Sequence, residues 1–352
     1  MSIGNSGTQE SQKNIDKRQS TGEFVRGVSQ FRHQLGKNIM FPAEADRYHL
    51  FVALNCPWCH RVTLARNILG LQGSISMDVV FPNRTNSDDP DGANLWEFNP
   101  NKTASLTDKA FNECTYETAT GKSFRLIKQI YAAEDSSEHS VPILYDKLTK
   151  RIVSNESADI IRMLNAYAGE LGSSFDESTR PNLYPCIKEN NELCTSIDVL
   201  NEKIYININN GAYKAGFSSD QKVYVEAFKN YFQMLEQLNN LLATNNRPFL
   251  TGDTFTEADL RLFPTLYRHD PIYYLRMKLN GAKILDYPYL WQWLCRVYAL
   301  PGVANSNSLE HCKQGYFGRS WNNVIPLGPL QPMPYPEAYK HPELASINNF
   351  DA

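Results

Sequence analysis

The sequence of 352 residues contains no run of about 18 consecutive apolar residues, so we expect no membrane-spanning helix. The N-terminal stretch MSIGNSGTQESQKNIDKRQS has no apolar segment of the secretory kind. Lys and Arg total 35 against 38 Asp and Glu, a net charge of −3, so no strong positive field would attract nucleic acid or anionic lipid. These absences favour a cytoplasmic protein whose partners include neither nucleic acid nor a membrane.

Cysteine is sparse and scattered. An odd number of seven cysteines, without a signal peptide, indicates a reducing compartment rather than a disulfide framework. Only Cys56 and Cys59 are spaced as Cys-x-x-Cys, whereas a structural zinc site normally needs a second close pair. A haem of the c type is usually attached outside the cytosol. We therefore expect no metal and no haem.

The composition fits an ordinary globular chain, with 42% hydrophobic and 21% charged residues and a length suited to about two domains. Residues 47–54 are strand-like, residues 56–70 carry a helical apolar stripe closed by Gly70, and residues 75–82 are strand-like again. This order predicts a β-α-β unit with a parallel strand pair.

The remaining pattern predicts two more strands, a helix and then a long helical region. Residues 139–146 and 151–155 favour strands, and 156–167 favours a helix. We predict an α/β thioredoxin-like domain followed by an all-α domain. The expected boundaries are a polar arm at 1–45 that docks only in part, a thioredoxin-like domain at 46–168 with an insertion at 83–135, a helical domain at 180–322 and a Pro-rich extended tail at 323–352.

In this plan the stretch NCPWCHR at 55–61 lies where the first strand meets the first helix. Pro57 suits the first helical turn, and the electropositive helix N-terminus stabilises a thiolate at Cys56. Cys59 lies one turn deeper, where the pull is weaker. The pair suits either a dithiol redox centre or a single activated thiolate with a bystander. For His60 and Arg61, solvated helix surface and a supporting charge from Arg61 are equally consistent.

A second group of residues belongs to the same plan. Val141-Pro142 opens a strand, and we expect its peptide bond to be cis and to face the thiol. Asn155-Glu156-Ser157 precedes a helix, so Ser157 and the helix amides would hold a carboxylate while Glu156 takes an ammonium. Such a site binds an amino-acid head group, such as the γ-glutamyl end of glutathione. The alternative is a plain helix cap.

Several longer segments resemble one known family. They are RYHLFVALNCPWCHRVTLARNILGL, SVPILYDKLTKRIVSNESADIIRMLN, NINNGAYKAGF, LTGDTFTEADLRLFPTLYRHDPIYY and DYPYLWQWLCRVYALPGV. They resemble the glutathionyl-hydroquinone reductases, which are the xi-class glutathione transferases and are related to the omega class. The resemblance runs from about residue 24 to 328. It implies a homodimeric enzyme with glutathione as co-substrate. The capping box formed by Thr256 and Asp259 fits the same scheme as a folding signal.

The resemblance also implies roles for individual residues. Cys56 would be the nucleophile, and Tyr213 and Tyr316 would line the hydroquinone pocket. Glutathione would contact Trp96, Val141, Pro142, Glu156 and Ser157. The thiolate would attack the sulfur of an S-glutathionyl hydroquinone, and a second glutathione would release oxidised glutathione.

Two departures from the family pattern leave rival readings open. Where the family usually has Cys-Pro-Trp-Ala, this chain has Cys59, a candidate regulatory thiol that permits dithiol chemistry on protein disulfides. Before Val141 the usual Gly-Arg is replaced by Ser-Glu-His-Ser, so a basic glutathione contact is either missing or supplied by His139. A third reading is a binding protein without enzymatic activity that keeps only the scaffold.

Overall fold

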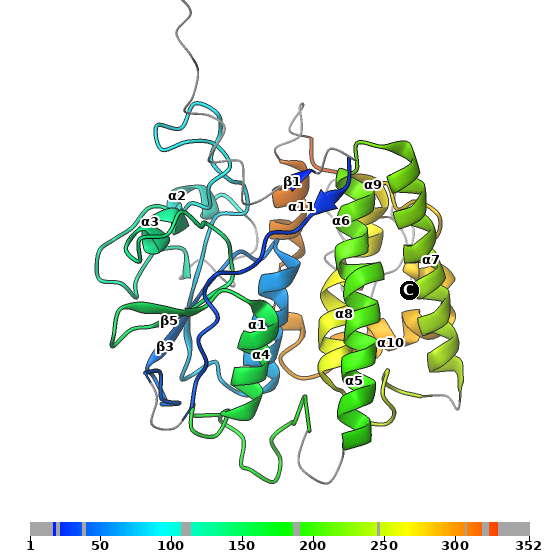
Figure 1. The fold of residues 1–352 in the computed structure, drawn as a ribbon, viewed down its shortest axis with the longest axis horizontal. Coiled ribbons are helices and arrows are strands. Elements are labelled where there is room, and N and C mark those ends of the chain that lie inside the picture. Colours follow the sequence, from blue (N-terminus) through cyan, green and yellow to red (C-terminus); the bar gives the residue numbers. More distant parts are fainter. Residues whose placement is uncertain are drawn as a thin grey trace, which may run out of the picture.

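The structure is a computed structural model that describes residues 17–18, 22–36, 40–106, 114–185, 191–244, 247–306, 308–318 and 324–329. Figure 1 shows a small sheet with its helices on one side and a bundle of longer helices on the other. Among these described residues, no helix combines the length and apolar character needed to cross a membrane.

A mixed sheet of four strands forms the first half of the fold. Its order is β4-β3-β5-β6, with β3 parallel to β4 and antiparallel to β5, and with β5 antiparallel to β6. The strands span Tyr48–Val52 (β3), Ser76–Val79 (β4), Ile143–Asp146 (β5) and Arg151–Ser154 (β6). Every residue of β3 is buried; four of the five are apolar or aromatic, and the fifth, His49, bonds Ser76 Oγ at 2.8 Å. The predicted thioredoxin-like order of elements is confirmed.

Helix α1 (Pro57–Ile68) follows β3 and packs against both α4 (Ser157–Ala166) and α8 of the helical half (Figure 1). Because it lies between two layers, α1 is buried on nearly every side. The reading of His60 and Arg61 as solvated surface is therefore wrong, since they are 1% and 2% exposed. His60 accepts a hydrogen bond from Arg268 and bonds Ser306 Oγ at 3.0 Å.

The segment between β4 and β5 carries two short helices, α2 (Pro100–Thr103) and α3 (Ile127–Ala132). Around them the chain pairs with itself in loops. The amide of Phe81 donates to Glu97 O at 2.8 Å, and the amide of Ile127 donates to Trp96 O at 3.1 Å. These bonds hold the stretch around Trp96 beside the end of the sheet.

The second half is helical, as predicted. Its elements are α5 (Asn191–Ile204), η2 (Tyr205–Asn209), α6 (Asn210–Phe217), α7 (Gln221–Ala243), α8 (Glu257–Arg268), η4 (His269–Tyr273), α9 (Tyr274–Arg276), η5 (Ile284–Asp286), α10 (Pro288–Tyr298), η6 (Ala304–Ser306) and α11 (Leu309–Phe317).

The predicted capping box begins α8. Asp259 accepts from the amide of Thr256 at 3.0 Å and also from Trp293 Nε1 at 2.8 Å, which ties α8 to α10. Burial raises the pKa of Asp259 to about 6. The box therefore joins helix initiation to core packing, and it lies apart from the pocket described below.

Described parts of the N-terminal arm pair with one another and with the sheet. Strands β1 (Lys17–Arg18) and β2 (Phe24–Val25) pair with each other, and residues 26–36 run along the end of β6. The amide of Asn155 donates to Phe31 O at 3.0 Å, and the amide of His33 donates to Val153 O at 3.0 Å. Within residues 22–36, Phe31 and His33 thus bond β6 and the residue after it through their backbones, while Val28 is 85% exposed. The other predicted domain boundaries stay predictions, and most of the tail at 323–352 falls outside the described residues.

Candidate active site

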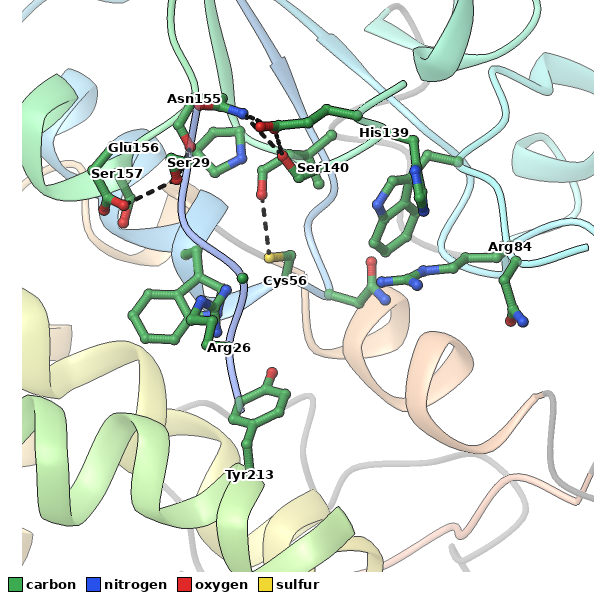
Figure 2. A pocket seen from close by; sticks show the side chains of 18 of the residues that line it. Arg26, Ser29, Cys56, Arg84, His139, Ser140, Asn155, Glu156, Ser157 and Tyr213 are labelled. Carbon is green, nitrogen blue, oxygen red and sulfur yellow. Dashed lines mark hydrogen bonds between the residues drawn. The ribbon is translucent and has the colours of Figure 1, made fainter. Parts of the chain in front are cut away.

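A cavity of about 1130 Å³ lies between the two halves of the fold (Figure 2). Its lining includes eight residues singled out in the sequence: Cys56, Trp96, Val141, Pro142, Glu156, Ser157, Tyr213 and Tyr316. The first six come from four segments of the thioredoxin-like half: the start of α1, the loop at Trp96, the segment before β5 and the start of α4. Tyr213 comes from α6 and Tyr316 from α11. The sequence-predicted residues therefore meet in one place.

Cys56 is the residue that precedes the first turn of α1, with φ −82° and ψ 121°. Its Sγ lies 3.9 Å from Val141 O, next to the cis bond between Val141 and Pro142 that the sequence predicted (Figure 2). A hydrogen bond from Cys59 lowers the pKa of the Cys56 thiol to about 6, with help from the amides of Cys59 and Trp58 and the charge of Arg26 and against the effect of burial. Cys56 is thus mostly thiolate at neutral pH.

The supporting charge comes from Arg26 and not from Arg61, the residue suggested by the sequence. The Arg26 guanidinium carbon lies 3.7 Å from the centre of the Trp58 ring. Arg61 also lies over that ring, at 4.4 Å, but its guanidinium is buried and donates to Asn209 Oδ1. The N-terminal arm therefore contributes a cation that favours the Cys56 thiolate.

Cys59 is fully buried and does not line the cavity. Its Sγ accepts from the amide of Ala53 at 3.3 Å. Burial raises the pKa of the Cys59 thiol well above its usual value, and the neighbouring Cys56 raises it further. Cys59 is therefore a protonated donor to the Cys56 thiolate, as its depth in the helix predicted.

Glu156 and Ser157 lie at the N-terminus of α4. Glu156 Oε1 accepts from the amide of Ala158 at 3.1 Å, so the helix-cap reading of the sequence is present. Its second oxygen accepts from Ser29 Oγ at 3.1 Å and lies at the cavity (Figure 2). The side chain caps the helix and still presents a carboxylate where an ammonium would bind.

Asn155 joins this carboxylate to the rest of the wall. Its amide nitrogen donates to Tyr131 OH at 3.1 Å, to Ser140 Oγ at 3.2 Å and to Glu138, and its oxygen accepts from the amide of Phe31 at 3.2 Å. Because these bonds connect β6, the segment before Pro142 and the arm, they fix the polar wall as a unit.

The far end of the polar wall is formed by Trp96, Arg84 and His139. Trp96 is 4% exposed, and the guanidinium carbon of Arg84 lies 4.3 Å from its ring centre. Burial, followed by the nearby charge of Arg84, lowers the pKa of His139. His139 is therefore a neutral imidazole at pH 7, and it does not replace the missing basic contact as a cation.

The helical half supplies an aromatic wall. Tyr213 OH lies 2.6 Å from Tyr316 OH, which lies 3.1 Å from Tyr273 OH. Burial raises the pKa of all three phenols. The three groups are neutral at physiological pH, so they can donate and accept hydrogen bonds next to an aromatic guest.

Four residues of this arrangement were missed by the sequence reasoning: Arg26, Ser29, Arg84 and Tyr273. Arg26 and Ser29 belong to the amphipathic stretch EFVRGVSQFRHQLG, whose apolar residues were the signal that it docks. Tyr273 belongs to the quoted segment that ends in DPIYY. For Arg84, in a loop rich in Asn, Asp and Pro, no pattern pointed to the cavity.

Two family models match the chain. Residues 55–166 match the N-terminal domain of glutathione S-transferases, and residues 213–296 match the C-terminal domain. Among curated relatives, the glutathionyl-hydroquinone reductase PcpF of Sphingobium chlorophenolicum is 35% identical over 91% of this chain and 94% of its own length. The glutathionyl-hydroquinone reductase YqjG of Escherichia coli K12 is 37% identical over 89% of each chain.

Solved structures agree with these relatives. The glutathione S-transferase Xi of Phanerochaete chrysosporium matches with a TM-score of 0.77 at 33% identity, covering 91% of this chain and 99% of that one. The glutathione-bound structure of Escherichia coli YqjG matches with a TM-score of 0.72 at 35% identity, covering 88% of this chain and 96% of that one.

Proposed function

The chain belongs to the glutathione S-transferase family, and within it to the xi class, and from this premise we propose that it is a glutathionyl-hydroquinone reductase. Cys56 is the nucleophile, and glutathione is the co-substrate. The observation that carries the proposal is one cavity with a low-pKa thiol between an amino-acid site at Glu156 and a cluster of neutral phenols.

The chemistry has two steps. The Cys56 thiolate attacks the sulfur of an aryl glutathionyl thioether, the bond from sulfur to the ring carbon breaks, and that carbon takes a proton to give the hydroquinone. Cys56 is left as a mixed disulfide with glutathione. A second glutathione thiolate attacks the glutathionyl sulfur, which forms oxidised glutathione and returns the Cys56 thiolate. Overall, thioether plus glutathione gives hydroquinone plus oxidised glutathione.

The two walls suit the two parts of this substrate. Glu156 offers a carboxylate for the α-ammonium of the γ-glutamyl group, while Ser157 and the α4 amides suit its α-carboxylate. Val141 presents its carbonyl beside the Cys56 sulfur. Tyr213 and Tyr316 present hydroxyl groups to the oxygens of a hydroquinone ring.

The test is steady-state turnover of 2-(glutathion-S-yl)hydroquinone with glutathione, followed by chromatography of both products. We expect one hydroquinone and one oxidised glutathione for each thioether consumed. The same sample is then given a protein disulfide without glutathione. If it reduces the protein disulfide but not the thioether, the chain is a dithiol oxidoreductase, the rival that the Cys59 hydrogen bond favours. If it does neither, the chain is a binding protein on this scaffold.

We propose further that the enzyme works as a homodimer in the cytoplasm. Five of the six cysteines within the described ranges form no disulfide, which supports a reducing compartment. Cys194 is disulfide-bonded, contrary to our expectation from the cysteine pattern. Each chain has a mass of 40.1 kDa. Light scattering behind size exclusion should therefore give twice the chain mass, and the mass of a single chain would refute the dimer.

A further inference from the structure

Glutathione carries a carboxylate at each end, together with an ammonium at the γ-glutamyl end, and the polar wall accounts for the γ-glutamyl end. Its γ-glutamyl end suits Glu156, Ser157 and the N-terminus of α4, on one side of Cys56. Its glycyl carboxylate must then lie on the other side of the thiol. The four residues before Val141 read Ser-Glu-His-Ser and include no arginine or lysine. A cation for the glycyl end has to come from elsewhere in the chain.

The arginines among the described lining residues are Arg26, Arg32, Arg84 and Arg276. Arg32 is held by Asp159 through bonds of 2.7 and 2.8 Å, at the γ-glutamyl end. Arg276 donates to Tyr316 O at 3.0 Å and so belongs to the aromatic wall. Arg26 stacks on Trp58, between Cys56 and Tyr213 in Figure 2.

Arg84 lies across Cys56 from Glu156 and Ser157. Figure 2 shows its guanidinium extending toward the centre of the cavity, below His139 and on the side opposite to Glu156. His139 shares this end but is a neutral imidazole at pH 7, since burial and Arg84 lower its pKa. Arg84 therefore places a permanent positive charge at this end of the cavity.

The position of Arg84 is built into the backbone. The next residue, Thr85, is 4% exposed, donates from its amide to Leu95 O at 2.9 Å and accepts from the amide of Asn94 at 3.0 Å. The Thr85 hydroxyl also bonds Gly92 O at 2.7 Å and the amide of Leu95 at 2.9 Å. These bonds pair the Arg84 segment with the Trp96 segment and place the guanidinium over the indole. Stacking on the indole fixes the plane of the guanidinium.

We propose that Arg84, stacked on Trp96, binds the glycyl carboxylate of glutathione and so selects thiols that carry a negative charge at that end. The inference rests on the proposed function. It makes Arg84 a binding residue in the loop that precedes Trp96, in a chain whose segment before the cis-proline contains no arginine or lysine. A guanidinium over an aromatic ring meets a planar carboxylate with two parallel hydrogen bonds.

The test compares two ligands that differ by one charge. Glutathione and its glycyl monoethyl ester are titrated calorimetrically into full-length protein carrying Cys56→Ser, which binds without turnover. We expect glutathione to bind about tenfold more tightly than the ester, the size of a charge-assisted hydrogen bond at a half-buried site. Adding Arg84→Gln should weaken glutathione binding about tenfold and leave the ester unchanged, so that the two ligands bind alike.

Two further variants sharpen the result. Arg84→Lys keeps the charge without the planar fork and should retain part of the preference for glutathione. Lys128→Gln removes a charge that acts on His139 but does not line the cavity, and it should leave the preference intact. Equal losses for glutathione and ester in Arg84→Gln, or an unchanged preference, would overturn the assignment of Arg84.

The outcome separates this inference from the proposed function. If Cys56→Ser protein binds both ligands equally and Glu156→Gln weakens both, glutathione binds but Arg84 does not read its glycyl end. If the protein binds neither ligand and the native chain does not turn over the thioether, both the function and the Arg84 assignment fail.

Discussion

The two walls of the cavity are built in different ways. The polar wall takes Val141, Pro142, Glu156 and Ser157 from two short segments beside the sheet and α4. Its carboxylate is fixed by the amide of Ala158 and by Ser29, and the Val141 carbonyl lies beside Cys56. The aromatic wall takes Tyr213 from α6 and Tyr316 from α11, whose hydroxyl groups bond each other, and Tyr273 of η4 bonds Tyr316 from behind the wall. A wall of backbone amides and capped carboxylates suits one invariant ligand, glutathione. A cluster of neutral phenols suits rings whose oxygens vary in position.

Cys56 serves both walls, so its loss should have the largest effect. Cys56→Ser should abolish turnover of the glutathionyl thioether, because an alcohol is a poor nucleophile and forms no mixed disulfide. Calorimetry should still show glutathione binding, since the polar wall is intact. Retained turnover in Cys56→Ser would mean that another group carries the reaction. The conclusion that both walls position substrate around Cys56 would then be wrong.

The same contrast explains what the sequence could predict. The polar wall was predictable because each of its parts is local: a cysteine before Pro57, a Val-Pro pair and a Glu-Ser pair before a helix. Tyr213 and Tyr316 came only from the resemblance, since nothing in spacing or periodicity brings residues about a hundred positions apart together. Arg26, Ser29 and Arg84 could not be predicted because they lie in loops. The positions of these loops are set by contacts between residues distant in the sequence, which form only in the folded chain.

The burial of His60 and Arg61 shows a further limit. A helix with polar residues after its second cysteine has the pattern of a surface helix. In the structure α1 lies between the sheet and α8, and each polar side chain finds a partner there: Ser306 and Arg268 for His60, and Asn209 for Arg61. Sequence periodicity predicts a single buried face for a helix. It therefore underestimates the burial of polar residues on a helix such as α1, which two domains cover.

Glu156→Gln should give the next largest effect, and on the polar wall alone. The amide still caps α4 through its oxygen, but it loses the charge that would pair with the γ-glutamyl ammonium. A hydrogen bond between charged groups is worth about 1.5–3 kcal/mol, so glutathione affinity should fall at least tenfold. Calorimetry of glutathione binding measures it. Asp159→Asn is the matched control, because it removes a carboxylate from the first turn of α4 that Arg32 holds outside the ammonium site. Equal losses of glutathione affinity in both variants would indicate a nonspecific effect of negative charge near α4 rather than a contact between Glu156 and the ammonium.

Removing hydroxyl groups from the aromatic wall should have a smaller and more selective effect. Tyr213→Phe with Tyr316→Phe removes a bonded pair at 2.6 Å while keeping both rings. A net hydrogen bond is worth about 0.5–1.5 kcal/mol, so kcat/KM for the hydroquinone thioether should fall roughly 2- to 13-fold. Reduction of a small aliphatic glutathione disulfide should barely change.

A tyrosine outside the cavity provides the control for that experiment. Tyr224, on α7, donates a hydrogen bond from its hydroxyl to Lys278 O at 2.8 Å. Tyr224→Phe therefore removes a comparable bond without touching either wall. It should leave both substrates unaffected. If the double variant loses activity equally on both substrates, the tyrosines support the fold and the division of labour between the walls is wrong.

The smallest effect concerns Cys59, which touches neither wall. Its hydrogen bond is the largest cause of the lowered pKa of Cys56, about 6, so Cys59→Ala should raise that pKa by at least about one unit. A thiol reacts as the thiolate, which predominates above its pKa and is lost below it. The thiolate fraction of Cys56 in Cys59→Ala should therefore fall about threefold at pH 6.5 and hardly change at pH 8.5. Alkylation rates across pH measure the shift.

Turnover should follow the same pH dependence, because glutathione resolves the mixed disulfide at Cys56 and needs no second cysteine of the chain. Cys59→Ala should also lose the reversible inactivation by mild oxidant that a Cys56–Cys59 disulfide would cause. Cys312→Ala, which removes an equally buried thiol bonded to Leu54 O, should change neither property. If Cys59→Ala is inactive even at pH 8.5, the resolving thiol belongs to the chain itself, and NCPWCHR is a dithiol centre acting on disulfides.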